Sequence, residues 1–121
     1  MNLEFDNNIP IYIQIVEQLK IYIISGKIKS GEKLPSVRDL ANKIKVNPNT
    51  MQKALIELEN LKLVYTERTN GKYVTTDEKL IAELKNEYAR NLSDGFLEEM
   101  QNIGYSFGQV LEYLNKKGGI K

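Results

Sequence analysis

The segment VNPNTMQKALIELENL, residues 46–61, carries the strongest helix signal of this chain. Asn47 is a preferred helix N-cap, and Pro48 suits the first helical turn. The apolar residues that follow recur three or four positions apart, as on the buried face of a helix. They are Met51, Ala54, Leu55, Leu58 and Leu61. We therefore expect a helix that begins at Asn47 and buries this stripe.

A shorter helix is expected directly before this one, over about residues 37–43. Ser36, followed three positions later by Asp39, resembles a capping box with a shorter acid. Only residues 44–46 separate the two helices, which is about the turn length of a helix-turn-helix. A third amphipathic helix, over residues 10–26, is predicted to precede the pair.

Two β-rich runs follow, at residues 63–66 and 72–75, around an Asn70-Gly71 turn. This arrangement is typical of a β-hairpin. A hairpin directly after the second helix of a helix-turn-helix is the layout of a winged helix. The predicted fold class is mainly α with a small β-hairpin. We expect an N-terminal winged helix-turn-helix at residues 1–75 and a C-terminal two-helix dimerisation segment at residues 76–121.

The C-terminal segment is predicted to form two helices with a break near Gly104. Thr75 with Glu78, and Ser106 with Gln109, have the spacing of capping boxes for these helices. Gly118-Gly119 predicts a frayed end.

An apolar stripe follows the first of these helices: Leu80, Leu84, Tyr88, Leu92, Phe96 and Met100. A helical hairpin has little core of its own, so we expect this stripe to form the contact of a twofold homodimer. The alternative is that the stripe packs back onto the winged helix of its own chain.

The charge of the chain is unevenly distributed. The net charge is +1, whereas residues 27–53 carry 7 Lys+Arg and 2 Asp+Glu, a local charge of +5. A local basic surface on a nearly neutral protein suits a polyanionic partner. A solvated basic face is the alternative.

The composition argues against catalysis. The chain has no cysteine and no histidine, which excludes disulfides, thiolate and imidazole metal sites, and nucleophile–imidazole pairs. The neighbouring carboxylates Glu57 and Glu59, or Glu98 and Glu99, do not face each other on a helix. The phosphate-binding loop G-x-x-x-x-G-K-[ST] is also absent from the sequence. We expect no enzyme activity, metal or cofactor.

The sequence also predicts a cytoplasmic protein without a membrane partner. Residues 1–10 lack the basic and then apolar pattern of a signal peptide. No apolar run reaches the roughly 18 residues that a transmembrane helix needs.

Three motifs together resemble the GntR family of bacterial transcription regulators: PIYIQI (residues 10–15), GKIKSGEKLPSVRDLA (residues 26–41) and VNPNTMQKA (residues 46–54). The resemblance covers residues 10–74 and implies a winged helix that binds double-stranded DNA. Because only 46 residues follow Thr75, the chain resembles the YtrA-like branch, whose short helical tail mediates dimerisation. The resemblance further implies repression, and release by a small effector.

The chain departs from the family pattern at two places. Family wings usually read Arg-Gly-x-Gly, whereas this chain has Arg68-Thr69-Asn70-Gly71. Lys62 stands where family members tend to have glycine, and it is strained if its backbone is left-handed.

The start of the helix at residue 47 is expected to read bases, as in other helix-turn-helix proteins. Asn and Gln side chains can pair with adenine, and Thr can contact a thymine methyl group. Gln52 lies on the same side as Asn49. For Asn47, capping the helix is the alternative and compatible role.

The resemblance assigns Arg38 to DNA, with an ion pair to a nearby acid as the alternative. We expect phosphate contacts from Ser36 and Lys53, and a wing contact from Gly71 and Lys72; a solvated lysine and a plain hairpin turn are the alternatives. The predicted DNA-binding residues are Ser36, Arg38, Asn47, Pro48, Asn49, Thr50, Gln52, Lys53, Gly71 and Lys72.

These observations predict a transcription regulator that binds a pseudopalindromic operator as a homodimer. The alternative is a winged helix that serves as a protein-interaction module without specific DNA binding, since a fold does not dictate its function. For the effector, we hypothesise a small apolar ligand between the C-terminal helices, near Tyr88, Phe96, Tyr105 and Phe107.

Overall fold

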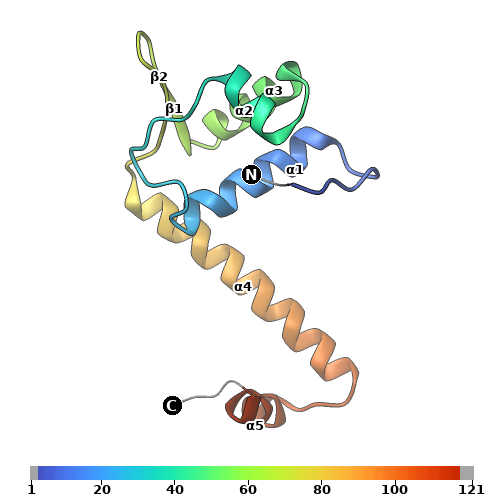
Figure 1. Cartoon of the computed structure of the whole chain (residues 1–121). Coiled ribbons are helices and arrows are strands. Elements are labelled where there is room, and N and C mark those ends of the chain that lie inside the picture. Colours follow the sequence, from blue (N-terminus) through green and yellow to red (C-terminus); the bar gives the residue numbers. More distant parts are fainter. Residues whose placement is uncertain (1–2, 118–121) are drawn as a thin grey trace. The chain divides into compact units, whose positions relative to one another are not determined.

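The computed structural model describes residues 3–117 of the chain. The chain is divided into two compact units. The first ends at Leu84 and the second begins at Lys85. The elements, in chain order, are α1 (Ile11–Ile24), α2 (Val37–Ile44), α3 (Pro48–Asn60), β1 (Val64–Glu67), β2 (Gly71–Val74), α4 (Glu78–Asn102) and α5 (Phe107–Lys117) (Figure 1). The predicted fold class, mainly α with a small β-hairpin, is confirmed.

Helix α3 lies at the centre of the first unit. It packs against α1, α2 and β1, and its residues Met51, Ala54, Leu55 and Leu58 are completely buried. The prediction was wrong for Leu61, which is 38% exposed. Leu61 is the C-cap residue of α3, so it follows the last full turn and does not continue the buried stripe.

A glutamine side chain holds the segment that enters α1. The Gln14 amide Nε2 donates to the backbone carbonyls of Asp6 and Ile9, at 2.7 and 2.8 Å, and its Oε1 accepts from the Asp6 N–H at 2.8 Å. These bonds fold residues 6–9 against the start of the helix. The helix itself begins after Pro10, its N-cap residue.

The wing is hydrogen-bonded along both edges of β2. On one edge β1 pairs with it in antiparallel register, Val64 opposite Val74 and Glu67 opposite Gly71. On the other edge, residues 31–34 bond to it: the Gly31 N–H donates to the Val74 carbonyl at 3.0 Å, and the Leu34 N–H to the Lys72 carbonyl at 2.8 Å. The loop that leads into α2 is therefore fixed to the wing.

Helix α4 begins differently from the prediction. Asp77, not Thr75, caps it, because the Asp77 Oδ1 accepts from the Leu80 N–H at 3.1 Å. Thr75 is buried and its hydroxyl accepts from the Asp77 N–H, while Glu78 accepts a hydrogen bond from the Ser30 hydroxyl. Thr75 therefore fixes the residue that caps the helix.

The second unit confirms the other two features predicted for the tail. The chain turns at Gly104, with φ of 99°. Ser106 and Gln109 form a complete capping box: the Gln109 N–H donates to the Ser106 hydroxyl at 3.2 Å, and the Ser106 N–H to the Gln109 side chain at 2.9 Å. Gly118-Gly119, where fraying was predicted, lies outside the described residues.

The first turns of α4 belong to the first unit. Leu80, Ile81 and Leu84 are half-buried and pack against its core. For this reason the division between the units falls after Leu84, whereas the sequence suggested a boundary after residue 75. Across residues 3–117, none of the helices has the length and apolar character needed to cross a membrane.

Candidate nucleic-acid interface

The start of α3 presents a group of polar side chains to solvent. Asn47 caps the helix, its Oδ1 accepting from the Asn49 N–H at 2.7 Å. The residues Asn47, Pro48, Asn49, Gln52 and Lys53 are exposed, and Thr50 is half-buried. The predicted cap and the predicted base-reading side chains therefore coincide at one accessible helix end.

The start of α2 is accessible as well. Ser36 is its N-cap residue, and its hydroxyl oxygen accepts from the Asp39 N–H at 3.1 Å. Arg38, in the first turn of the helix, is exposed. Within residues 3–117 no carboxylate lies within ion-pair distance of Arg38, so its guanidinium is available to an external anion.

A hollow of about 610 Å³ lies between the start of α2 and the wing. Its lining comes from the loop before α2 (residues 33–36), from the first residue of α2 and from the wing turn (residues 70–72). It therefore contains Ser36, Gly71 and Lys72, three of the predicted contact residues. Gly71 has φ of 109°, a left-handed value that favours glycine in this turn.

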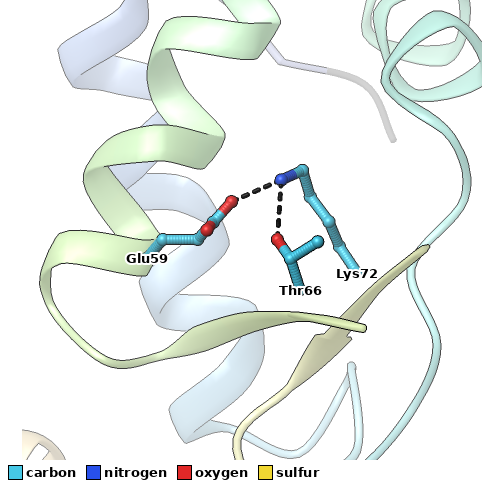
Figure 2. Close-up of polar contacts among 3 residues, drawn as sticks. All are labelled: Glu59, Thr66 and Lys72. Carbon is cyan, nitrogen blue, oxygen red and sulfur yellow. Dashed lines mark hydrogen bonds and ion pairs between the residues drawn. The ribbon is translucent and has the colours of Figure 1, made fainter. Parts of the chain in front are cut away.

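Lys72 turns away from solvent toward α3. Its ammonium forms an ion pair with Glu59 and donates a hydrogen bond to the Thr66 hydroxyl at 3.1 Å, as Figure 2 shows. The Lys72 side chain is 19% exposed and that of Glu59 is 30% exposed. The charge of Lys72 is therefore compensated inside the domain, and the contact fixes the wing to α3.

Lys53 lies over an aromatic ring. Its Nζ is 4.2 Å from the centroid of the Tyr12 ring, a distance typical of a cation–π contact. Tyr12 is half-buried and packs against the core from α1. This contact holds the Lys53 side chain near the start of α1, while Lys53 remains exposed to solvent.

Sequence reasoning missed two cations at the wing. Lys33 lies in the loop before α2 and lines the hollow, and Arg68 is exposed in the turn between β1 and β2. Lys33 comes close to the wing only because residues 31–34 bond to β2. The basic character of residues 27–53 was the available signal, but it did not single out Lys33.

The predicted dimerisation residues fall into two groups. Leu80 and Leu84 pack on the core of the first unit, as in the alternative considered from the sequence. In the second unit, Leu92 is 73% exposed and Phe96 40% exposed, while Tyr88 and Met100 are half-buried. Helix α5 adds a second set of exposed apolar side chains: Phe107, Leu111, Tyr113 and Leu114.

A hollow of about 320 Å³ lies within the second unit, at the junction of α4 and α5. Tyr105 and Tyr113 line it and meet edge to face, with ring centroids 6.1 Å apart. Of the four residues in the effector hypothesis, only Tyr105 lines this hollow. No group of three acidic residues within residues 3–117 is arranged to hold a metal ion.

Comparison with known protein sequences identifies the first unit. Residues 11–74 match the family described as "Bacterial regulatory proteins, gntR family". The HTH-type transcriptional regulator YhcF of Bacillus subtilis (strain 168) is 36% identical over 112 residues, which cover 93% of each protein. The HTH-type transcriptional repressor YtrA of the same organism is 47% identical over 70 residues, which cover 58% of this chain and 54% of YtrA.

Solved structures agree with this assignment. A GntR family transcriptional regulator from Listeria monocytogenes superposes with a TM-score of 0.83 at 41% identity, over 93% of this chain and 98% of that one. AraR(DBD), solved in complex with operator ORX1, gives a TM-score of 0.56 at 26% identity, over 62% of this chain and 95% of that one. This chain belongs to the gntR family of bacterial regulatory proteins, and its first unit is the winged helix-turn-helix of a transcriptional regulator.

Proposed function

We propose that this chain is a transcriptional repressor that binds a pseudopalindromic DNA operator as a homodimer. One observation carries the proposal: the starts of α2 and α3 and the wing each present polar or cationic side chains on a single fixed unit. Helix-turn-helix proteins read bases with the N-terminal part of the second helix. The relative AraR was solved with an operator, which supports the same use here.

In this proposal, base reading falls to Asn49, Thr50 and Gln52 on α3. Asn and Gln amides can bond bidentately to adenine in the major groove. Asn47 has its Oδ1 engaged as the helix cap, so its NH₂ group is the part offered to DNA. Pro48 follows it as the first residue of α3. Arg38, Ser36 and Lys53 would contact phosphates, which fixes the register of the protein on the duplex.

The homodimer is proposed to form through the second unit. Leu92 and Phe96 on α4, and Phe107 and Leu111 on α5, are large apolar side chains that solvent reaches. Burying them against a second copy would remove this surface from water. A closed twofold dimer would present two copies of α3 to two half-sites.

Release by a small effector is part of the proposal. The hollow with Tyr105 and Tyr113 offers aromatic walls within the second unit. Thermal-shift measurements across a panel of metabolites test this part. A shift that is lost in Tyr113→Ala supports it, and flat melting curves across the panel contradict it.

Fluorescence anisotropy tests the proposed DNA binding. The wild-type chain should bind DNA from its own upstream region more tightly than a scrambled duplex. Asn49→Ala should weaken this binding by about 1–3 kcal/mol, because one base contact is lost. Asn60→Ala, at the exposed opposite end of the same helix, is the matched control and should bind like the wild type.

The same anisotropy experiment distinguishes DNA binding from the rival function, in which the winged helix binds only protein. If neither duplex binds even at low salt, the chain does not act on DNA. The local charge of +5 over residues 27–53 argues against this rival, because the centre of a protein-binding face is usually depleted in charge.

A further inference from the structure

We infer that Lys33, rather than Lys72, supplies the phosphate contact at the wing. This inference rests on the proposed DNA binding and adds to it a residue from the loop before α2. It concerns the hollow between that loop and the wing, whose volume is about 610 Å³.

The backbone places Lys33 beside the wing. Lys33 forms an isolated antiparallel bridge with Tyr73 of β2, and the N–H of the next residue, Leu34, donates to the Lys72 carbonyl. Residues 31–34 thus act as a short third strand at the edge of the hairpin. The position of Lys33 is therefore fixed by main-chain hydrogen bonds.

The side chain of Lys33 runs along the wing turn. A Cβ atom built on Gly71 would lie 3.4 Å from the Lys33 Cε, so the end of the lysine passes directly beside this glycine. Gly71 lacks a side chain that would cover it. The ammonium therefore stands at the part of the wing that a DNA backbone would approach.

The charges in the hollow favour Lys33 over Lys72. Glu59 and Thr66 already engage the Lys72 ammonium (Figure 2). Lys33 is exposed and, among the described residues, forms no ion pair. The lining of the hollow holds two lysines, Ser36 and Asn70 but no carboxylate, so an approaching phosphate would meet no negative side chain there.

The N-terminus of α2 also favours the binding of a phosphate group in this hollow. Ser36 and Val37 both line the hollow, and they form the N-terminal end of α2. The N-terminus of a helix carries a partial positive charge that favours phosphate. Lys33 and the α2 terminus would therefore act on the same phosphate group from two sides.

A salt titration of DNA binding tests the inference. The slope of log K against log [salt] changes by about 0.9 for each phosphate neutralised. Loss of one contact in each of two protomers should therefore lower the magnitude of the slope by about 1.8 in Lys33→Gln. Affinity for the operator and for a scrambled duplex should fall by the same factor, because a phosphate contact carries no sequence information.

Lys72→Gln is the matched control. It also removes a lysine charge from the lining of the hollow, but Glu59 rather than a phosphate engages that ammonium. The salt slope of Lys72→Gln should therefore equal that of the wild type, although its stability should fall with the loss of the contact to α3. Far-UV circular dichroism of both variants confirms that they are folded.

Three results would overturn the inference: an unchanged slope in Lys33→Gln, an equal loss of slope in Lys72→Gln, or a loss in Lys33→Gln confined to the operator. Failure of the proposed function itself is recognised separately, because the wild-type chain would then bind no DNA.

Discussion

Two lysines adopt left-handed backbone angles where helices end. Lys45 has φ of 65° and is the C-cap residue of α2, and Lys62 has φ of 67° directly after α3. Such a conformation costs an L-residue about 1–2 kcal/mol. The buried position of Leu63 and its N–H bond to the Leu58 carbonyl require this turn, so packing outweighs the strain at Lys62.

We expect Lys62→Gly to stabilise the chain. It relieves about 1–2 kcal/mol of backbone strain, and the greater freedom of the unfolded chain offsets about 0.4–1 kcal/mol of this gain. Chemical denaturation should show a free energy of unfolding up to about 1.6 kcal/mol higher. Lys43→Gly, in the exposed last turn of α2, is the control and should lose about 1 kcal/mol. Equal losses in both variants would contradict the argument.

The wing is an element held from two sides, by residues 31–34 on one edge and by the Lys72–Glu59 contact to α3. A lone two-stranded hairpin is marginally stable in water. These contacts give the wing a fixed position beside α2 and α3, which are the other two elements of the proposed DNA surface. The proposed DNA surface is therefore already ordered before the protein binds DNA.

Glu59→Gln tests this role of the ion pair. We expect a loss of about 1 kcal/mol in the free energy of unfolding, since a partly buried ammonium loses its charged partner. DNA affinity should not fall, because the released Lys72 ammonium adds positive charge to the hollow. Glu57→Gln, two positions earlier on α3, serves as the control and should stay within about 0.5 kcal/mol of the wild type. A drop in DNA affinity with unchanged stability would argue against a structural role.

Local sequence patterns predicted most elements of the fold. Apolar periodicity located the helices, the Asn70-Gly71 turn located the hairpin, and Ser106 with Gln109 located the start of α5. Residue spacing alone did not identify the cap of α4: Thr75 and Glu78 fit a capping box, yet Asp77 provides the cap. Several residues near a helix start can cap it, and tertiary contacts such as Ser30 with Glu78 decide among them.

The sequence predicted which residues of each helix in the candidate site are exposed, but not which side chains from different elements meet there. The exposed positions of Asn49 and Arg38 follow from the period of their helices. The pairing of Lys72 with Glu59, and the approach of Lys33 to Gly71, depend on how the wing folds back on α3 and on the loop before α2. No local signal encodes these distances, so the sequence favoured Lys72 and overlooked Lys33.

At the scale of the whole molecule, the two units differ in how they bury apolar side chains. Buried residues from α1, α2, α3 and the hairpin form a core in the first unit. In the second unit Val110 is fully buried, whereas Leu92, Ile103 and Phe107 are all more than half exposed. A unit with so much accessible apolar surface suits an association role.

Leu92→Glu should weaken the proposed dimer. Removing a leucine from an interface costs about 1.5–3 kcal/mol, and the change occurs twice in a twofold dimer. The dissociation constant measured by sedimentation should therefore rise by at least about a hundredfold. Asn91→Glu adds the same charge at the neighbouring exposed position and should leave the dimer intact. A monomeric wild-type chain, or equal effects of the two variants, would contradict this dimer.

Hydroxyl-radical footprinting on the bound operator is the decisive experiment for a dimeric repressor, because it shows how many recognition helices contact the DNA. Two protected half-sites related by twofold symmetry, with centres about 10–10.5 bp or a multiple of that apart, are expected for a dimeric helix-turn-helix regulator. A single protected half-site, or uniform protection without sequence preference, would contradict the account of this chain as a dimeric, operator-specific repressor.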